Sequence, residues 1–172
     1  MSWSKISALV FACSIVLLNS CGFTPLYKHE SDSVGLFNHF AAIDIAPIES
    51  RIGQQLRNRL QDKLNPRGKT LEPLYRLIIT INETRNDVVI LKDATSTFAK
   101  ITMRAQYKLE SLNKEQILTS GTTVATTGFN ITQSEYVNIQ AEDGAKSRLA
   151  EQIGMNIEKL LALFLKSAIN KD

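Results

Sequence analysis

The most regular alternation of apolar and polar positions in the chain lies between residues 99 and 110. Its odd positions are apolar and its even positions are polar or charged. Because successive side chains of a β-strand point to opposite faces, this pattern predicts a strand with one buried and one solvated face. Such a strand is typical of an antiparallel sheet that is covered on one side only.

Three other segments predict strands. Residues 41–48 are short and rich in isoleucine, residues 74–85 alternate with Ile78 as the exception, and residues 116–127 are rich in threonine. Threonine fits either face, so the register of this last strand is left open. Residues 86–94 form either a connection or an extension of the hairpin between its neighbours.

Two segments have helical periodicity. In residues 50–64 apolar side chains recur every fourth position, with Ser50 placed to cap the first turn and Pro66 just beyond the last. In residues 140–168 an apolar stripe follows i, i+3 and i, i+4 spacing: Ala145, Leu149, Ile153, Ile157, Leu160, Leu161 and Phe164. Both segments are therefore expected to pack one face against a core.

The predicted order is β-α-β-β-β-α, an α+β fold. The first two strands should pair in parallel through a right-handed crossover, and the next two should follow as a meander. We expect a two-layer sandwich: a mixed four-stranded sheet with two helices on one face and a polar face left open. Residues 41–170 would form this single domain.

The N-terminus has the layout of an export signal. Lys5 precedes an apolar run over residues 6–18, which is about 20 Å long as a helix and too short for a hydrocarbon core of about 30 Å. The run leads to Leu18-Asn19-Ser20-Cys21, a small residue before a cysteine as in a lipoprotein signal peptide. We expect residues 1–20 to be removed and Cys21 to carry a diacylglycerol and an N-acyl chain. The alternative is an uncleaved anchor in which Cys21 is an ordinary thiol.

The residue after this cysteine bears on the destination. Gly22 lacks the aspartate that commonly retains lipoproteins in the inner membrane, so the outer membrane is the expected location, with the domain facing the periplasm. Residues 22–38 are polar, with Pro25, Gly35 and no periodicity, and we interpret residues 21–40 as a lipidated tether.

Composition narrows the function classes. Loss of residues 1–20 would leave 152 of the 172 residues, enough for one domain, with a formal charge of +2 from 19 basic and 17 acidic side chains. That charge is too small to indicate nucleic acid as a partner. Cys13 would leave with the signal and Cys21 would be a thioether, so neither a disulfide nor thiol catalysis is expected.

No constellation for catalysis or for a cofactor is found. His29 and His39 lie ten residues apart without a cysteine or carboxylate at ligand spacing, which argues against a metal site. Turn chemistry explains Glu83 and Asp87, and dipole complementation at the start of the last helix explains Glu142. We therefore expect a protein that is not an enzyme.

Two basic features remain as candidates for binding. Residues 49–69 carry six Lys and Arg against two carboxylates. The predicted strand over residues 99–110 places Lys100, Arg104 and Lys108 in one row on the uncovered face of the sheet. Either feature is a solvated surface, where basic residues deter aggregation, or a surface for anionic groups such as phosphates.

The first residues of the expected mature chain carry a resemblance. They read Cys21-Gly22-Phe23-Thr24-Pro25-Leu26-Tyr27. This heptapeptide, together with the length and the element order, resembles the lipopolysaccharide-assembly lipoprotein family LptE. No motif outside this segment carries a ligand contact over from the family.

The resemblance implies a function and partners. Such a protein plugs the outer-membrane β-barrel LptD, helps the barrel to assemble, and assists delivery of lipopolysaccharide to the cell surface. The basic row of Lys100, Arg104 and Lys108 would then meet lipid A phosphates or acidic residues of the barrel lumen. An alternative is an auxiliary lipoprotein subunit of an ABC-type lipid transporter, which can share the same kind of anchor and a small α/β domain.

Overall fold

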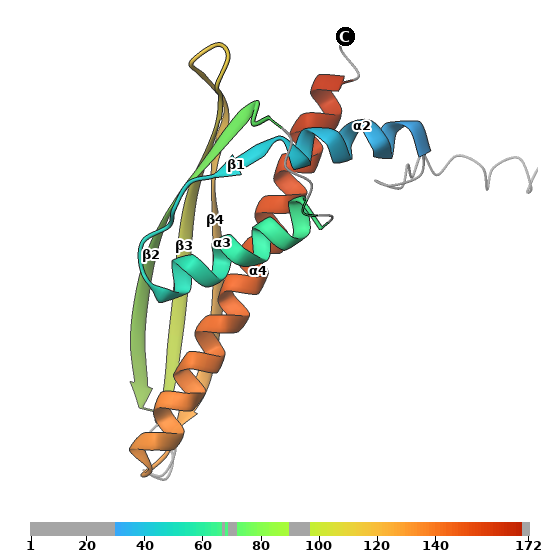
Figure 1. Cartoon of the computed structure of the whole chain (residues 1–172). Coiled ribbons are helices and arrows are strands. Elements are labelled where there is room, and N and C mark those ends of the chain that lie inside the picture. The colour runs from blue at the N-terminus through green and yellow to red at the C-terminus, as the bar shows by residue number, and fades with distance from the viewer. Residues whose placement is uncertain (1–29, 67, 69–71, 90–96, 170–172) are drawn as a thin grey trace, which may run out of the picture. The chain divides into compact units, whose positions relative to one another are not determined.

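The computed structural model describes residues 30–66, 68, 72–89 and 97–169 (Figure 1). The chain divides into two compact units, Met1–Ser33 and Val34–Asp172. The described part of the first unit is limited to the first residues of helix α2 (Glu30–Ala41). The second unit contains the sheet and the remaining helices.

The sheet has four strands in the order in which they occur along the chain. They are β1 (Ile43–Ile45), β2 (Tyr75–Val89), β3 (Thr97–Ser111) and β4 (Gln116–Ile131). β1 pairs in parallel with β2, and β2, β3 and β4 pair antiparallel. The predicted parallel crossover and the meander are therefore both confirmed.

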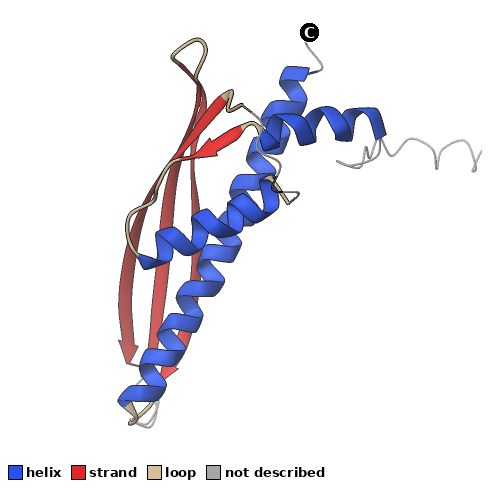
Figure 2. Cartoon of the chain, in the orientation of Figure 1, coloured by secondary structure: helices blue, strands red, loops and turns tan. Residues whose placement is uncertain are grey.

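Helices α3 (Arg51–Leu64) and α4 (Glu135–Ile169) cover one face of this sheet (Figure 2). α4 follows β4 and runs back along the sheet, and α3 packs against α4. The result is the expected α+β two-layer arrangement, preceded in the described part of the chain by the additional helix α2. The predicted order β-α-β-β-β-α is confirmed from β1 onward.

The core lies between the sheet and the two helices. The odd positions of β3 from Ala99 to Leu109 are buried, as their alternation predicts. Large side chains with less than 2% exposure come from every layer: Leu56, Leu60, Leu64, Leu77, Ile101, Met103, Leu109, Leu149, Ile153, Ile157 and Leu161. Each such side chain contributes about 1.5–3 kcal/mol by leaving water.

The start of α3 shows why the helix begins where it does. Ser50 precedes the first turn, and its Oγ accepts a hydrogen bond of 3.2 Å from the Gly53 amide. A Cβ atom at Gly53 would lie 2.7 Å from Cγ2 of Ile48, so a glycine permits this close approach. The predicted cap is confirmed.

The segment that we interpret as a tether is helical over the part that the structure describes. Residues 30–41 form α2, with Leu36 and Phe40 each 6% exposed. These two apolar residues lie four apart on one helix face, a signal too short to distinguish from chance in a polar segment. At the end of α2, the Leu74 amide donates to the Ala42 carbonyl at 2.9 Å. Residues 21–29 of the proposed tether lie outside the described residues.

Several element bounds also differ from the prediction. β1 is three residues long, and Ala46 and Ile48 belong to the connection between β1 and α3. β2 extends to Val89 and β4 to Ile131. α4 begins at Glu135, five residues before the predicted start. The interpretation of Glu83 and Asp87 as turn residues is wrong, since both lie within β2.

Candidate functional site

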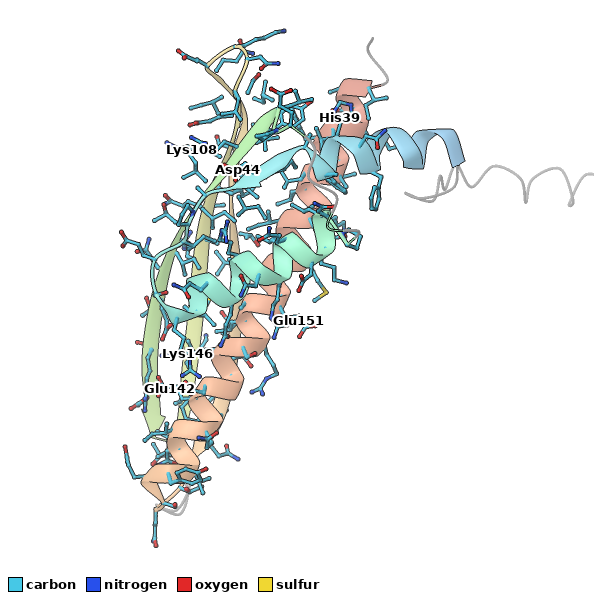
Figure 3. The ribbon with its side chains drawn as sticks, viewed as in Figure 1. His39, Asp44, Lys108, Glu142, Lys146 and Glu151 are labelled. Carbon is cyan, nitrogen blue, oxygen red and sulfur yellow. The ribbon has the colours of Figure 1, made fainter. Side chains whose placement is uncertain are left out.

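The basic row lies on the open face of the sheet, as its spacing predicts. Lys100, Arg104 and Lys108 alternate along β3 with buried residues, and all three are exposed. Successive members are four residues apart, which places them about 13 Å from one another along the strand. Figure 3 shows Lys108 toward the end of the sheet that also carries Asp44.

The cross-strand neighbours of the basic row carry no charge, whereas Glu110 follows two positions after Lys108 on β3 and lines the same groove as Lys108 does. The sheet register places the following neighbours on β2 and β4: Asn86 and Gly128 beside Lys100, Asn82 and Val124 beside Arg104, Ile78 and Ser120 beside Lys108. Within the described residues, none of the three cations makes a salt bridge or a side-chain hydrogen bond. In the described part of the chain, the fold therefore gives these three cations no ion-pair partner.

Polar uncharged side chains fill the space between the cations. Thr102 and Thr126 are joined across the strands by a hydroxyl contact of 3.2 Å. Gln106 lies between Thr80 and Thr122. This segment of the face borders a groove of about 360 Å³, lined in part by Gln106 and Lys108. The face thus offers cations spaced along a hydroxyl-rich and amide-rich surface.

The end of the sheet near β1 differs from the rest of the open face. Arg76 pairs there with Asp44 at 3.2 Å, and Glu110 lies opposite Arg76 in the register. One arginine and two carboxylates lie at this end, so the excess of positive charge on the open face lies in the stretch from Lys100 to Lys108.

The second basic feature of the sequence serves the fold. On α3, Arg51 pairs with Asp143 at 3.1 Å and Arg59 with Glu151 at 3.2 Å, both across to α4. Arg57 donates to the Ile45 carbonyl at 2.9 Å. These three arginines already have partners within the fold, and in the described part of residues 49–69 Lys63 is the cation that makes no such contact.

A charged network on the covered side was not anticipated from the sequence. Lys146 on α4 contacts Glu83 at 2.9 Å and Glu142 at 2.8 Å, and Arg85 pairs with Glu142 and Asp87. Figure 3 shows Glu142 and Lys146 in the first half of α4, where the helix lies beside the sheet. Hydrogen bonds to Glu142 and Glu83 raise the pKa of Lys146, and the hydrogen bond to Asp87 raises the pKa of Arg85.

The remaining candidates make no site in the described residues. His39 Nδ1 lies 2.9 Å from the hydroxyl of Tyr75, a structural contact. No three His, Cys, Asp or Glu side chains gather as metal ligands there, and no helix of that part is long and apolar enough to cross a membrane. Cys21 and His29 lie outside the described residues.

Comparisons with solved structures show the same fold. A candidate lipoprotein from Caulobacter crescentus CB15 matches with a TM-score of 0.63 and 20% identity, over 77% of this chain and 96% of that one. Rare lipoprotein B from Shewanella oneidensis matches at 0.53 and 10%, over 74% and 96%. A minor lipoprotein from Acinetobacter baumannii matches at 0.53 and 10%, over 70% and 90%.

The family assignment comes from the sequence. A comparison with curated proteins finds no match. The family model LptE, described as lipopolysaccharide-assembly, matches residues 40–158, from the end of α2 to the last third of α4. That span contains the whole sheet and the basic row. The chain therefore belongs to the LptE family of lipopolysaccharide-assembly proteins.

Proposed function

We propose that this protein is an outer-membrane lipoprotein, anchored through lipid on Cys21, that plugs and helps to assemble an LptD-type β-barrel and assists lipopolysaccharide delivery to the cell surface. The family assignment supports lipopolysaccharide assembly over the ABC-transporter alternative. The open sheet face supports the finer proposal, because barrel interiors are polar and a polar face suits them.

The observation that carries the proposal is the set of cations without partners on the open face. Lys100, Arg104 and Lys108 are held at regular spacing on the third of four strands, and their neighbours on β2 and β4 are uncharged. A cation bound to a carboxylate of its own fold would have to give up that contact before it binds a ligand. These three keep their charge available for phosphates of lipopolysaccharide or for carboxylates of a barrel wall.

Binding of lipopolysaccharide by the full lipidated protein in detergent tests the role of the row. We expect the triple variant Lys100→Gln, Arg104→Gln, Lys108→Gln to bind at least about tenfold more weakly at low salt. The difference should shrink as salt is raised, because screening weakens contacts between exposed charges.

A matched control removes the same charge elsewhere. Lys63, Lys114 and Lys159 are exposed, lie on α3, in the β3–β4 turn and on α4, and make no salt bridge within the described residues. Their triple Gln variant should bind lipopolysaccharide as the wild type does. If both triple variants lose the same affinity for lipopolysaccharide, the effect is one of net charge. If neither loses affinity, lipopolysaccharide does not bind through this face.

Two further measurements test the anchor and the partner. Mass spectrometry of the mature N-terminus should find acylated Cys21, and an intact Met1 would contradict the anchor. Purification from outer membranes should recover an LptD-type barrel with the wild-type protein. Recovery of an inner-membrane ATPase complex instead would favour the transporter alternative.

A further inference from the structure

The outer edge of β4 lacks the usual protection of an edge strand. β4 is the last strand of the sheet, and among the described strands it pairs only with β3. Its sixteen residues, Gln116–Ile131, include no Lys, Arg, Asp, Glu or Pro. Edge strands of soluble proteins expose unpaired backbone groups and are normally guarded by charges, proline or bulges, because they otherwise pair with other chains.

The opposite edge of the sheet is guarded in the usual way. β1 covers β2 only at Tyr75–Leu77, so the rest of β2 is also an edge. That edge carries Glu83, Arg85 and Asp87 in ion pairs. Of the two edges, the β2 edge carries charged residues and the β4 edge does not.

The β4 edge is also regular along most of its length. The single shift of register between β3 and β4 lies between Leu109 and Glu110, close to the turn that joins them. From Thr119 to Ile131 the pairing runs without interruption. A strand added to this edge would therefore meet a continuous series of backbone donors and acceptors.

The residues of the open face indicate which side chains an added strand would carry on that face of the sheet. β4 contributes only small or uncharged residues there, among them Ser120, Thr122, Thr126 and Gly128. An added strand would lie two strand spacings, about 10 Å, from β3 and its row of cations. That distance is close to the Debye length at moderate salt, so carboxylates on the added strand would be attracted by the row.

The side toward the helices is apolar. Asn156 donates from Nδ2 to Oγ1 of Thr123 at 3.1 Å, which fixes this face of α4 against β4. One and two turns further on lie Leu160 and Leu163, 37% and 48% exposed. Apolar side chains of an added strand would cover these two leucines.

We propose that the free edge of β4 pairs with an extended segment of a partner protein, in which acidic residues on the open side alternate with apolar residues on the α4 side. Backbone hydrogen bonds supply the affinity, and alternate side chains supply the specificity. This pairing does not depend on lipopolysaccharide binding. A second copy of the chain is a poorer occupant, because symmetric pairing of two β4 strands puts two rows of cations on one face.

A synthetic peptide tests this edge directly. The probe is an acetylated, amidated ten-residue peptide of alternating glutamate and valine, and its counterpart carries lysine in place of glutamate. We expect the glutamate peptide to bind the full lipidated protein in detergent and to protect alternate β4 amides from hydrogen exchange. The Lys100→Gln, Arg104→Gln, Lys108→Gln variant should bind it roughly tenfold more weakly, and the Lys63, Lys114, Lys159 control variant as the wild type does.

Two proline variants separate pairing at the edge from pairing within the sheet. In an antiparallel strand the amides of neighbouring residues point to opposite sides. One of Thr126→Pro and Thr127→Pro therefore removes an amide at the free edge, and the other removes one that bonds to β3. We expect the variant that keeps the wild-type circular dichroism melt to lose peptide binding.

Three results would overturn the proposal. The first is that the glutamate peptide protects no β4 amide, or protects β2 instead. The second is equal binding of the glutamate and lysine peptides. The third is β4 protection in the protein alone: if it rises with protein concentration the occupant is a second copy, and if it does not the occupant is this chain itself.

Discussion

The two sides of the sheet differ in whether their cations have ion-pair partners. On the covered side, Lys146 and Arg85 between α4 and β2, and Arg51 and Arg59 on α3, all meet carboxylates contributed by another element. On the open face, the row of Lys100, Arg104 and Lys108 meets none within the described residues. Both sets are exposed enough to be solvated, so exposure alone does not distinguish them.

The difference separates charges that position elements from charges that remain available. The ion pairs of Arg51 and Arg59 connect α3 to α4, and those of Lys146 connect α4 to β2. A ligand that bound these cations would have to replace the carboxylates that they already contact. A ligand on the open face would not, and the stability of the protein should respond to the two faces accordingly.

The largest effect is expected in the core under the helices. Leu149 on α4 is fully buried, and Leu149→Ala should lower the free energy of unfolding by about 2–5 kcal/mol through lost burial and a cavity. On the open face, Gln106→Ala should change it by less than about 0.5 kcal/mol. Urea unfolding of both variants measures the contrast, and a comparable loss at Gln106 would mean that the open face is packed in solution.

A smaller effect is expected at the charged network. Lys146→Gln removes the cation between Glu83 and Glu142 and leaves two carboxylates near each other. We expect a loss of about 1 kcal/mol in the free energy of unfolding, because side chains about a quarter exposed are partly screened by solvent. The loss should diminish in high salt. A loss that is independent of salt would instead indicate that Lys146 acts through packing of its aliphatic stem.

The same network predicts a pH dependence. The pKa of Lys146 is raised in the folded protein by hydrogen bonds to Glu142 and Glu83, above an ordinary value of 10.5. Its contribution to stability is therefore complete below the unfolded pKa and is lost as the pH rises through the folded pKa. The difference in unfolding free energy between wild type and Lys146→Gln should be constant from pH 7 to 9 and should shrink above pH 10.5.

Comparing the wild type with Lys146→Gln isolates the contribution of Lys146 to the pH dependence. Burial raises the pKa values of Tyr75 and Tyr107, so both proteins should lose stability at alkaline pH for that reason. Taking the difference between wild type and variant cancels that common loss. A difference that closed near neutral pH would contradict the assignment to Lys146.

The sequence was informative where a signal is local. The alternation in β3 predicted which side chains are buried and which face carries the basic row, and Ser50 predicted the start of α3. Such patterns depend on residues within one element, so one chain suffices to recognise them. The same reasoning correctly predicted the parallel pairing of β1 with β2.

The sequence failed where the reason for a residue lies elsewhere in the chain. Glu83 looks like a turn residue, yet it lies on the covered side of β2, where Lys146 of α4 contacts it. Lys146 is 63 positions away from Glu83. α2 was missed for a similar reason, because its two buried residues, Leu36 and Phe40, are buried by tertiary contacts that the local sequence does not reveal.

The smallest effect on stability is expected from the basic row itself. Removing three exposed like charges that make no ion pair in the described part of the chain should leave the free energy of unfolding within about 0.5 kcal/mol of wild type. Any change should be a small gain at low salt, because mutual repulsion of the three cations is relieved. Urea unfolding of the Lys100→Gln, Arg104→Gln, Lys108→Gln variant at low and high salt measures this. A loss near that of Lys146→Gln would mean that the row is bound to carboxylates in solution, and the cations of the two faces would then serve the same purpose.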